Sequence, residues 1–160
     1  MKTMTKVLVF DMDDTLNQFY AVPNWLEDLH NESVRPYIIA EPKYDMEYLG
    51  NLLNELKMYG YIIAITTWLA KNATREYDNK VRKAKLEWLE KYQFPYDKIS
   101  MVRYGTTKAN STRKLKGYQV LFDDNDNIRK GWTLGDTVDA KDNILPFLEN
   151  LLKMEKLNKK

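Results

Sequence analysis

Apolar runs and apolar stripes alternate along this chain. The first run, residues 7–10, is unbroken and is followed at once by the acidic residue Asp11. An unbroken apolar run that ends in polar residues is typical of a strand buried inside a parallel sheet. Similar short runs occupy residues 61–65, 99–102 and 118–122, and residues 133–140 have room for a fifth short strand.

Between these runs, apolar residues recur at three- and four-residue spacing, which is typical of helices with one buried face. Residues 45–59 form a clear stripe, with Asp45 as the expected N-cap and Gly60 just past the C-terminus. We also expect helices at 71–92, 109–115 and 144–152, and a charged, frayed tail at 153–160. The stripe residues expected in the core are Met46, Leu49, Leu52, Leu53, Leu56, Val81, Ala84, Trp88, Leu89, Tyr92, Ile144, Phe147, Leu148, Leu151 and Leu152.

Strand-type and helix-type segments alternate, which predicts an α/β fold with a doubly wound parallel sheet and right-handed crossovers. The chain has 160 residues, which suits a single domain over residues 1–160 with a sizeable core. Residues 17–44 interrupt the alternation, because Pro23, Pro36 and Pro42 break regular structure. We expect this insert to be irregular apart from a short helix at residues 24–30.

Composition narrows the classes of function. The net charge of +2 gives no argument for nucleic acid or membrane as a partner. No apolar run approaches the roughly 18 residues that span a membrane, and residues 1–6 contain no signal-peptide core. The chain has no cysteine, which excludes disulfides and thiolate chemistry and fits a reducing compartment, so we expect a cytoplasmic protein.

The helix expected at residues 71–92 carries mixed charge on its second face, which is typical of a face in solvent. Residues 80–85 within it are locally basic, with Lys80, Arg82, Lys83 and Lys85. This segment either lies in solvent or binds a substrate phosphate or an oligonucleotide backbone.

Three carboxylates, Asp11, Asp13 and Asp14, follow the first predicted strand within four positions. In open α/β sheets, ligands bind just past the carboxyl ends of such strands. Carboxylates this close repel one another, and a bound cation would offset that repulsion. The alternative is a solvated acidic loop that caps a helix.

Polar residues also follow two further strands. Thr66 and Thr67 come after the run at 61–65, and Asp123 and Asp124 come after the run at 118–122. Because parallel strands end at the same edge of a sheet, we expect these side chains to converge on the first acidic cluster. Taken alone, the threonines could simply be β-branched residues that finish a strand.

The sequence from Asp11 to Thr15 after a hydrophobic strand resembles the first motif of the haloacid dehalogenase (HAD) superfamily, most of whose members are phosphatases. The resemblance implies that Asp11 is the nucleophile, which forms an aspartyl-phosphate. It implies that Asp13 is the general acid and base, in a less cationic setting than Asp11. Residues 17–44 would then be a small flap, or minimal cap, that leaves the site open.

The other HAD motifs have counterparts in order along the chain. The resemblance makes Thr66, with Thr67 beside it, a ligand of the phosphoryl group, and it requires a lysine that neutralises the nucleophile and the phosphate. Lys108 is our choice for that lysine because it stands just past the third strand, and Lys114 is the alternative. The implied Mg²⁺ ligands are Asp11, the main-chain carbonyl of Asp13, Asp123, and Asp124 directly or through water.

Within the superfamily, the chain is loosely similar to 5′(3′)-deoxyribonucleotidases and to the 3′-phosphatase domain of polynucleotide kinases. The first similarity implies a Mg²⁺-dependent phosphomonoester hydrolase acting on nucleotides, and the second implies a phosphatase of nucleic-acid ends. A further alternative is a phospho-accepting regulatory domain. The motif order argues against it, because a second acidic pair follows the fourth strand and the threonines precede the lysine.

Overall fold

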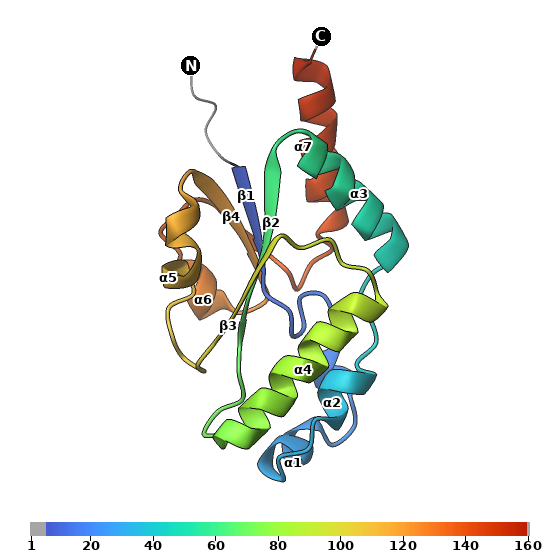
Figure 1. Cartoon of the computed structure of the whole chain (residues 1–160). Helices are drawn as coiled ribbons and strands as arrows, with labels where there is room; N and C mark the ends of the chain where they lie inside the picture. Colours follow the sequence, from blue (N-terminus) through green and yellow to red (C-terminus); the bar gives the residue numbers. More distant parts are fainter. Residues whose placement is uncertain (1–5, 160) are drawn as a thin grey trace.

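The computed structural model describes residues 6–159, so the predictions for residues 1–5 and for Lys160 lie outside the described part. A parallel sheet runs through the molecule in the strand order β3-β2-β1-β4-β5 (Figure 1). The strands are β1 (Lys6–Phe10), β2 (Tyr61–Trp68), β3 (Lys98–Val102), β4 (Tyr118–Asp123) and β5 (Thr137–Asp139). The strand order reverses between β1 and β4, the place where doubly wound sheets bind ligands.

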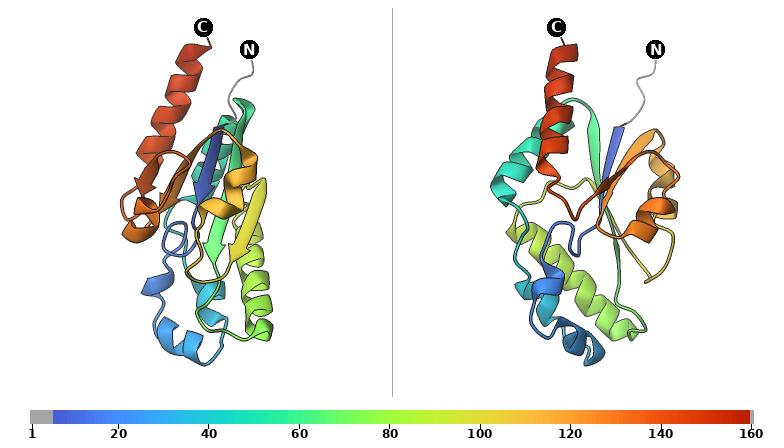
Figure 2. Two further views of the ribbon diagram at one scale, coloured as in Figure 1. Left: turned by 90° about the vertical axis from the view of Figure 1, so that its left-hand side faces the viewer. Right: turned by 180° about the vertical axis from the view of Figure 1, so that it is seen from behind.

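Helices cover both faces of the sheet, which confirms the predicted doubly wound α/β fold (Figure 2). One face packs against α3 (Met46–Met58), α7 (Leu145–Asn158) and the C-terminal part of α4 (Arg75–Lys91). The other packs against α5 (Ala109–Thr112), the 3₁₀ helix η2 (Arg113–Leu115) and α6 (Asp126–Lys130). Side chains of β1 alternate between the two layers, as a buried strand requires: Leu8 and Phe10 point to the first and Val7 and Val9 to the second.

Helix α3 shows how local sequence sets the element boundaries. The side chain of Asp45 accepts hydrogen bonds from the backbone N–H groups of Glu47 and Tyr48, so it is the predicted N-cap. Gly60, two residues beyond the last helical residue, has a φ of 93°, which favours glycine. The predicted stripe of α3 is buried throughout.

Residues 17–44 contain the 3₁₀ helix η1 (Phe19–Ala21), α1 (Trp25–His30) and α2 (Arg35–Ile39). They lie beside α4 at the carboxyl end of the sheet, at the bottom of Figure 1. The helix expected at 24–30 is therefore present as α1. Helix α2 was not expected, because Pro36 was interpreted as a residue that breaks regular structure. Pro36 lies in the first turn of α2, where its missing N–H costs no helical hydrogen bond.

Three other predictions need correction. The tail expected to fray beyond residue 152 continues α7 to Asn158, because Glu155 accepts a hydrogen bond from the hydroxyl of Tyr61 and pairs with Lys6. Phe147 is 38 % exposed and is not a core residue, although its ring packs edge-on against Phe122. Strand β2 extends through Trp68, so the two threonines lie inside it and not after it.

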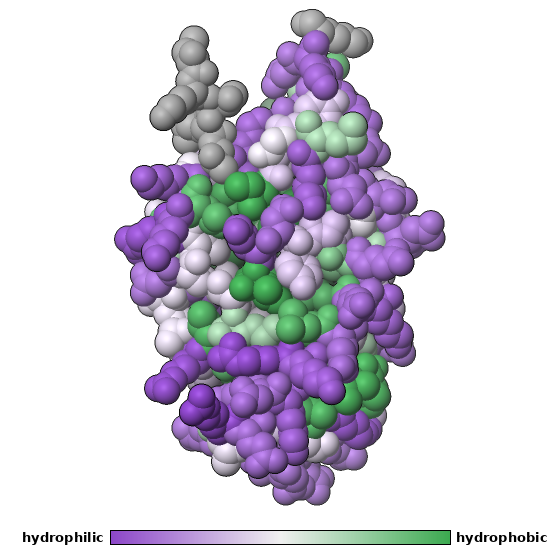
Figure 3. All heavy atoms as spheres, viewed as in Figure 1, coloured by the Kyte–Doolittle hydropathy of each residue, from purple (hydrophilic) through white to green (hydrophobic). Residues whose placement is uncertain are grey.

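Among residues 6–159, no helix is both long and apolar enough to cross a membrane. Hydrophilic side chains cover most of the face seen in Figure 3, with apolar patches across its middle and at lower right.

Candidate active site

Lys108 joins the two acidic clusters at the carboxyl edge of the sheet. The register pairs Phe10 of β1 with Phe122 of β4, so Asp11 and Asp123 leave the sheet side by side. The ammonium of Lys108, just before α5, donates to Oδ1 of Asp11 at 2.8 Å and to Oδ2 of Asp123 at 2.7 Å. Burial alone would lower the pKa of Lys108, but the two adjacent carboxylates outweigh it and the net pKa is raised.

This geometry distinguishes between the two lysines that the sequence offered for the site, Lys108 and Lys114. Lys108 is 3 % exposed and contacts both acidic clusters, whereas Lys114 lies in η2 and is exposed. The structure therefore places Lys108, and not Lys114, beside the candidate nucleophile. Thr15 holds the other oxygen of Asp11, to which its hydroxyl donates at 3.0 Å. Its spacing of four residues from Asp11, in the turn after β1, is the sequence signal for this contact.

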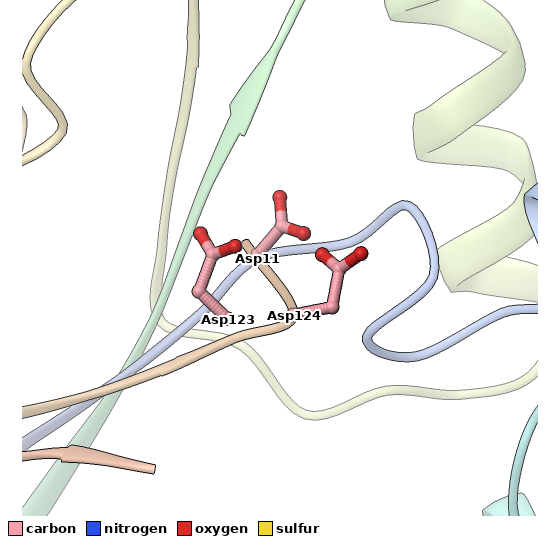
Figure 4. Close-up of side chains that lie close together, drawn as sticks. All are labelled: Asp11, Asp123 and Asp124. Atoms are coloured by element: carbon pink, nitrogen blue, oxygen red, sulfur yellow. The ribbon is translucent and has the colours of Figure 1, made fainter. Parts of the chain in front are cut away.

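Asp11, Asp123 and Asp124 form a carboxylate cluster that fits a divalent cation (Figure 4). One oxygen from each lies within 4.8 Å of the others. Burial, followed by the neighbouring carboxylates, raises the pKa of Asp123 to about 6 and that of Asp124 to about 8. Three converging carboxylates with one lysine between two of them carry net negative charge, and carboxylate oxygens are the ligands that Mg²⁺ prefers. The donor set therefore fits Mg²⁺.

The side chain of Asp13 stands apart from this cluster and pairs with Lys85. The ammonium of Lys85, in α4, donates to Oδ2 of Asp13 at 2.9 Å, to the hydroxyl of Thr67 at 2.7 Å and to the carbonyl oxygen of Trp68 at 3.0 Å. Burial, outweighing the lysine, raises the pKa of Asp13. Asp11 and Asp13 each contact one ammonium, so the less cationic setting expected for Asp13 stays a prediction.

Lys85 also corrects the interpretation of α4 as a helix with a fully solvated charged face. Its side chain has no exposed area, because the insert and the end of β2 cover it. Of the other basic residues, Lys80 and Lys83 are exposed and lie 3.5 and 3.8 Å from Glu76 and Glu87. The sequence did contain a signal: Lys85 follows Val81 by four residues and precedes Leu89 by four, so it lies on the buried stripe.

The two threonines point to opposite faces of β2 and are both buried. The hydroxyl of Thr66 lies 2.9 Å from that of Ser111, which in turn donates to the main-chain carbonyl of Lys108. The hydroxyl of Thr67 accepts from Lys85. Thr66 is thus linked through Ser111 to the main chain of Lys108, and Thr67 is bonded to the ammonium of Lys85. Neither threonine lines the cavity described next. Their predicted role as phosphate ligands stays a prediction.

A cavity of about 630 Å³ opens between the acidic cluster and the insert. Its polar floor includes Asp11, Asp13, Lys108, Asp123 and Asp124. Its walls carry two aromatic pairs, each with ring centroids 4.8 Å apart. Tyr20 and Trp25 come from the insert, and Trp68 and Tyr104 come from the end of β2 and the turn after β3. The cavity thus combines charged groups suited to a phosphate with aromatic surfaces suited to a planar ring.

Comparison of the chain with models of known protein families and with curated protein sequences finds no match. Function is therefore inferred from the residues of this chain and their geometry.

Proposed function

We propose that this protein is a Mg²⁺-dependent phosphomonoester hydrolase that acts through an aspartyl-phosphate on Asp11. The observation that carries the proposal is the contact of Lys108 with both Asp11 and Asp123, at the floor of a cavity where Asp124 completes a cation-binding set. The resemblance of the motifs to those of the HAD superfamily supports the same chemistry.

In the first step, a carboxylate oxygen of Asp11 attacks phosphorus, and the bond from phosphorus to the leaving oxygen breaks. Asp13 gives its proton to that leaving oxygen. In the second step, Asp13 takes a proton from a water molecule whose oxygen attacks phosphorus, and the bond from phosphorus to Asp11 breaks. Splitting one displacement into two in this way lowers the barrier of each.

Lys108 keeps Asp11 paired with a positive charge before the attack and faces the phosphoryl oxygens during it. An ammonium is suited to this role because it is a compact point charge. Asp11, Asp123, Asp124 and the main-chain carbonyl of Asp13 would hold Mg²⁺, which when bound offsets the charge of the carboxylates and withdraws charge from phosphorus.

The aromatic walls favour a nucleotide as substrate. Stacking on an aromatic side chain holds a base without regard to its identity, and the cavity offers Tyr20, Trp25, Trp68 and Tyr104. The nucleic-acid end phosphatase is less well supported by residues 80–85. Lys85 is buried, Arg82 donates to the main-chain carbonyl of Met101, and Lys80 and Lys83 lie beside glutamates. We therefore propose a mononucleotide as the substrate. The proposed location of the protein is a reducing compartment such as the cytoplasm.

Phosphate release from a panel of substrates tests this function. The panel contains 5′- and 3′-mononucleotides and a 3′-phosphorylated oligonucleotide, each with Mg²⁺ and with EDTA. We expect Mg²⁺-dependent release from mononucleotides by the wild type and none by Asp11→Asn. Asp126→Asn is the matched control, because Asp126 is 58 % exposed on α6 and pairs with Arg129 and Lys130.

Two outcomes would redirect the proposal. Turnover restricted to the oligonucleotide, falling steeply with added salt, would favour the end-processing activity. Absence of turnover on every substrate, with a long-lived phosphorylated protein, would favour a regulatory domain over an enzyme.

A further inference from the structure

Lys85 is a buried cation that the reaction as described above does not use. Its side chain has no exposed area, and its three hydrogen bonds, to Asp13, Thr67 and Trp68, use all three donors of the ammonium group. Placing a lysine inside a protein is costly unless its charge and donors are matched. Here the matching charge is the candidate acid and base of the reaction.

Asp13 depends on this contact more than Lys85 does. Oδ2 of Asp13 accepts from Lys85, while its other oxygen, Oδ1, is buried and has no hydrogen-bond partner within residues 6–159. Lys85 therefore makes the one polar contact recorded for this carboxyl group in the described part of the chain. A carboxyl group fixed by one hydrogen bond loses its orientation when that bond is removed.

We propose that Lys85 is a positioning residue, which holds the carboxyl group of Asp13 where it can exchange a proton with the leaving group and then with water. This inference rests on the proposed function and adds to it a residue from outside the four motifs. Helix α4 carries Lys85, and the ring of Tyr37 from the insert lies 5.3 Å from the ammonium. The acid and base is thus held jointly by the sheet edge, α4 and the insert.

After proton transfer, Asp13 is a carboxylate and Lys85 is its counter-ion at hydrogen-bond distance. This pairing holds the group in place for the second step, in which it receives a proton from water. Lys108 serves Asp11 in the same manner, so the two carboxylates that take part in the reaction each have their own lysine.

Leaving-group dependence separates positioning from a merely structural role. p-Nitrophenolate is a stable leaving group that needs little protonation, whereas the alkoxide of a nucleotide needs a proton. General acid catalysis contributes about 10²–10⁴-fold to such steps. We expect Lys85→Met to lower kcat/KM for a nucleoside monophosphate by about 10-fold or more, and for p-nitrophenyl phosphate by less than about 3-fold.

Three further variants sharpen the test. Lys85→Gln has a side chain one atom shorter than lysine, but it still donates hydrogen bonds, so it should recover part of the selectivity lost in Lys85→Met. In an Asp13→Asn background, Lys85→Met should change the ratio of the two kcat/KM values no further, because the group it positions is gone. Lys83→Met, on the same helix but 77 % exposed, should resemble the wild type.

Crystal structures of the wild type and Lys85→Met provide a readout that does not depend on activity. The variant should show the Asp13 side chain displaced or in alternative rotamers, with α4 and β2 unmoved. An undisplaced Asp13, or equal loss of both activities, would overturn the proposal. If the wild type hydrolyses neither substrate, the proposed function fails, and the crystal structures still decide whether Lys85 positions Asp13.

Discussion

The ammonium of Lys108 lies 2.8 Å from Oδ1 of Asp11, a residue 97 positions earlier in the chain. The same nitrogen donates to Asp123, so one cation offsets two buried carboxylates. We expect Lys108→Met to lower kcat by about 10²–10³-fold, as the loss of one electrostatic contact to a transition state does. Steady-state kinetics with a nucleoside monophosphate would measure this.

Lys114→Met is the control for this variant, because Lys114 is exposed in η2 and was the alternative choice for the site lysine. Its activity should stay within about 2-fold of the wild type, as expected for an exposed residue remote from the reaction. Equal losses in the two variants would show that the contact of Lys108 with Asp11 has no special part in the reaction.

Stability without metal should depend on pH through Asp123 and Asp124. Their pKa values are raised from 3.8 to about 6 and about 8, chiefly by burial and then by Asp11. The folded protein thus favours their neutral forms, so their contribution to stability is complete below about pH 4 and is lost as pH rises through about 6 and 8. In EDTA, the melting temperature should fall over this range.

Mg²⁺ should reverse that loss, because it binds the ionised carboxylates. The rise in melting temperature on adding Mg²⁺ should be larger at about pH 8 than at about pH 5. Asp124→Asn should remove the upper part of the pH dependence. A Mg²⁺ effect that shrinks as pH rises would contradict the assignment of this cluster as the metal site.

The aromatic wall of the cavity should govern substrate affinity more than rate. Tyr104 is 53 % exposed and its ring lies 4.8 Å from that of Trp68, so its removal should not unfold the protein. We expect Tyr104→Leu to raise KM for nucleoside monophosphates by about 5-fold or more, the lower end of measured base stacking, with little change in kcat. Tyr118 is also exposed, but it lies at the end of β4 opposite to Asp123. Tyr118→Leu should therefore leave KM unchanged.

The C-terminal turns of α7 should contribute to stability. Glu155 accepts from the hydroxyl of Tyr61 at 3.0 Å and pairs with Lys6, and its side chain is 16 % exposed. Glu155→Ala should lower the free energy of unfolding by about 1 kcal/mol, measured by urea denaturation. Glu149→Ala removes a similar bond to the exposed Tyr48 and should have a much smaller effect. If the C-terminus is frayed, the two variants should have the same free energy of unfolding, which would contradict this prediction.

The positions of the acids could be predicted from the sequence. The spacing of Lys85 from Val81 and Leu89 indicates that Lys85 is buried, but it does not identify Asp13 as its partner. Apolar runs that end in Asp11 and Asp123 identify buried strands, and parallel strands end at one edge, so the meeting of these residues follows from the pattern alone. Lys108 could be chosen by its place after β3. These inferences need only the direction in which each strand runs.

The role of Lys85 was missed because the basic residues 80–85 were expected either to lie in solvent or to bind a phosphate. Whether Lys85 lies in solvent depends on the neighbouring elements, and here the insert and the end of β2 cover the position between Val81 and Leu89. The threonines show the same limit. Strand β2 continues one residue beyond Thr67, to Trp68, because it pairs with β3 up to the position opposite Val102. Tertiary contacts of this kind are not encoded in the periodicity of a single segment.

The most direct test of the central claim is to trap the phosphoryl group on Asp11. Wild-type protein, Asp13→Asn and Asp11→Asn would be mixed with Mg²⁺ and p-nitrophenyl phosphate, whose leaving group needs little protonation, then quenched in acid and digested for mass spectrometry. The account predicts a phosphoryl group on the peptide that contains Asp11, accumulating in Asp13→Asn because the second step lacks its base, and absent in Asp11→Asn. Rapid hydrolysis without any adduct on Asp11, or an adduct on another residue, would contradict it.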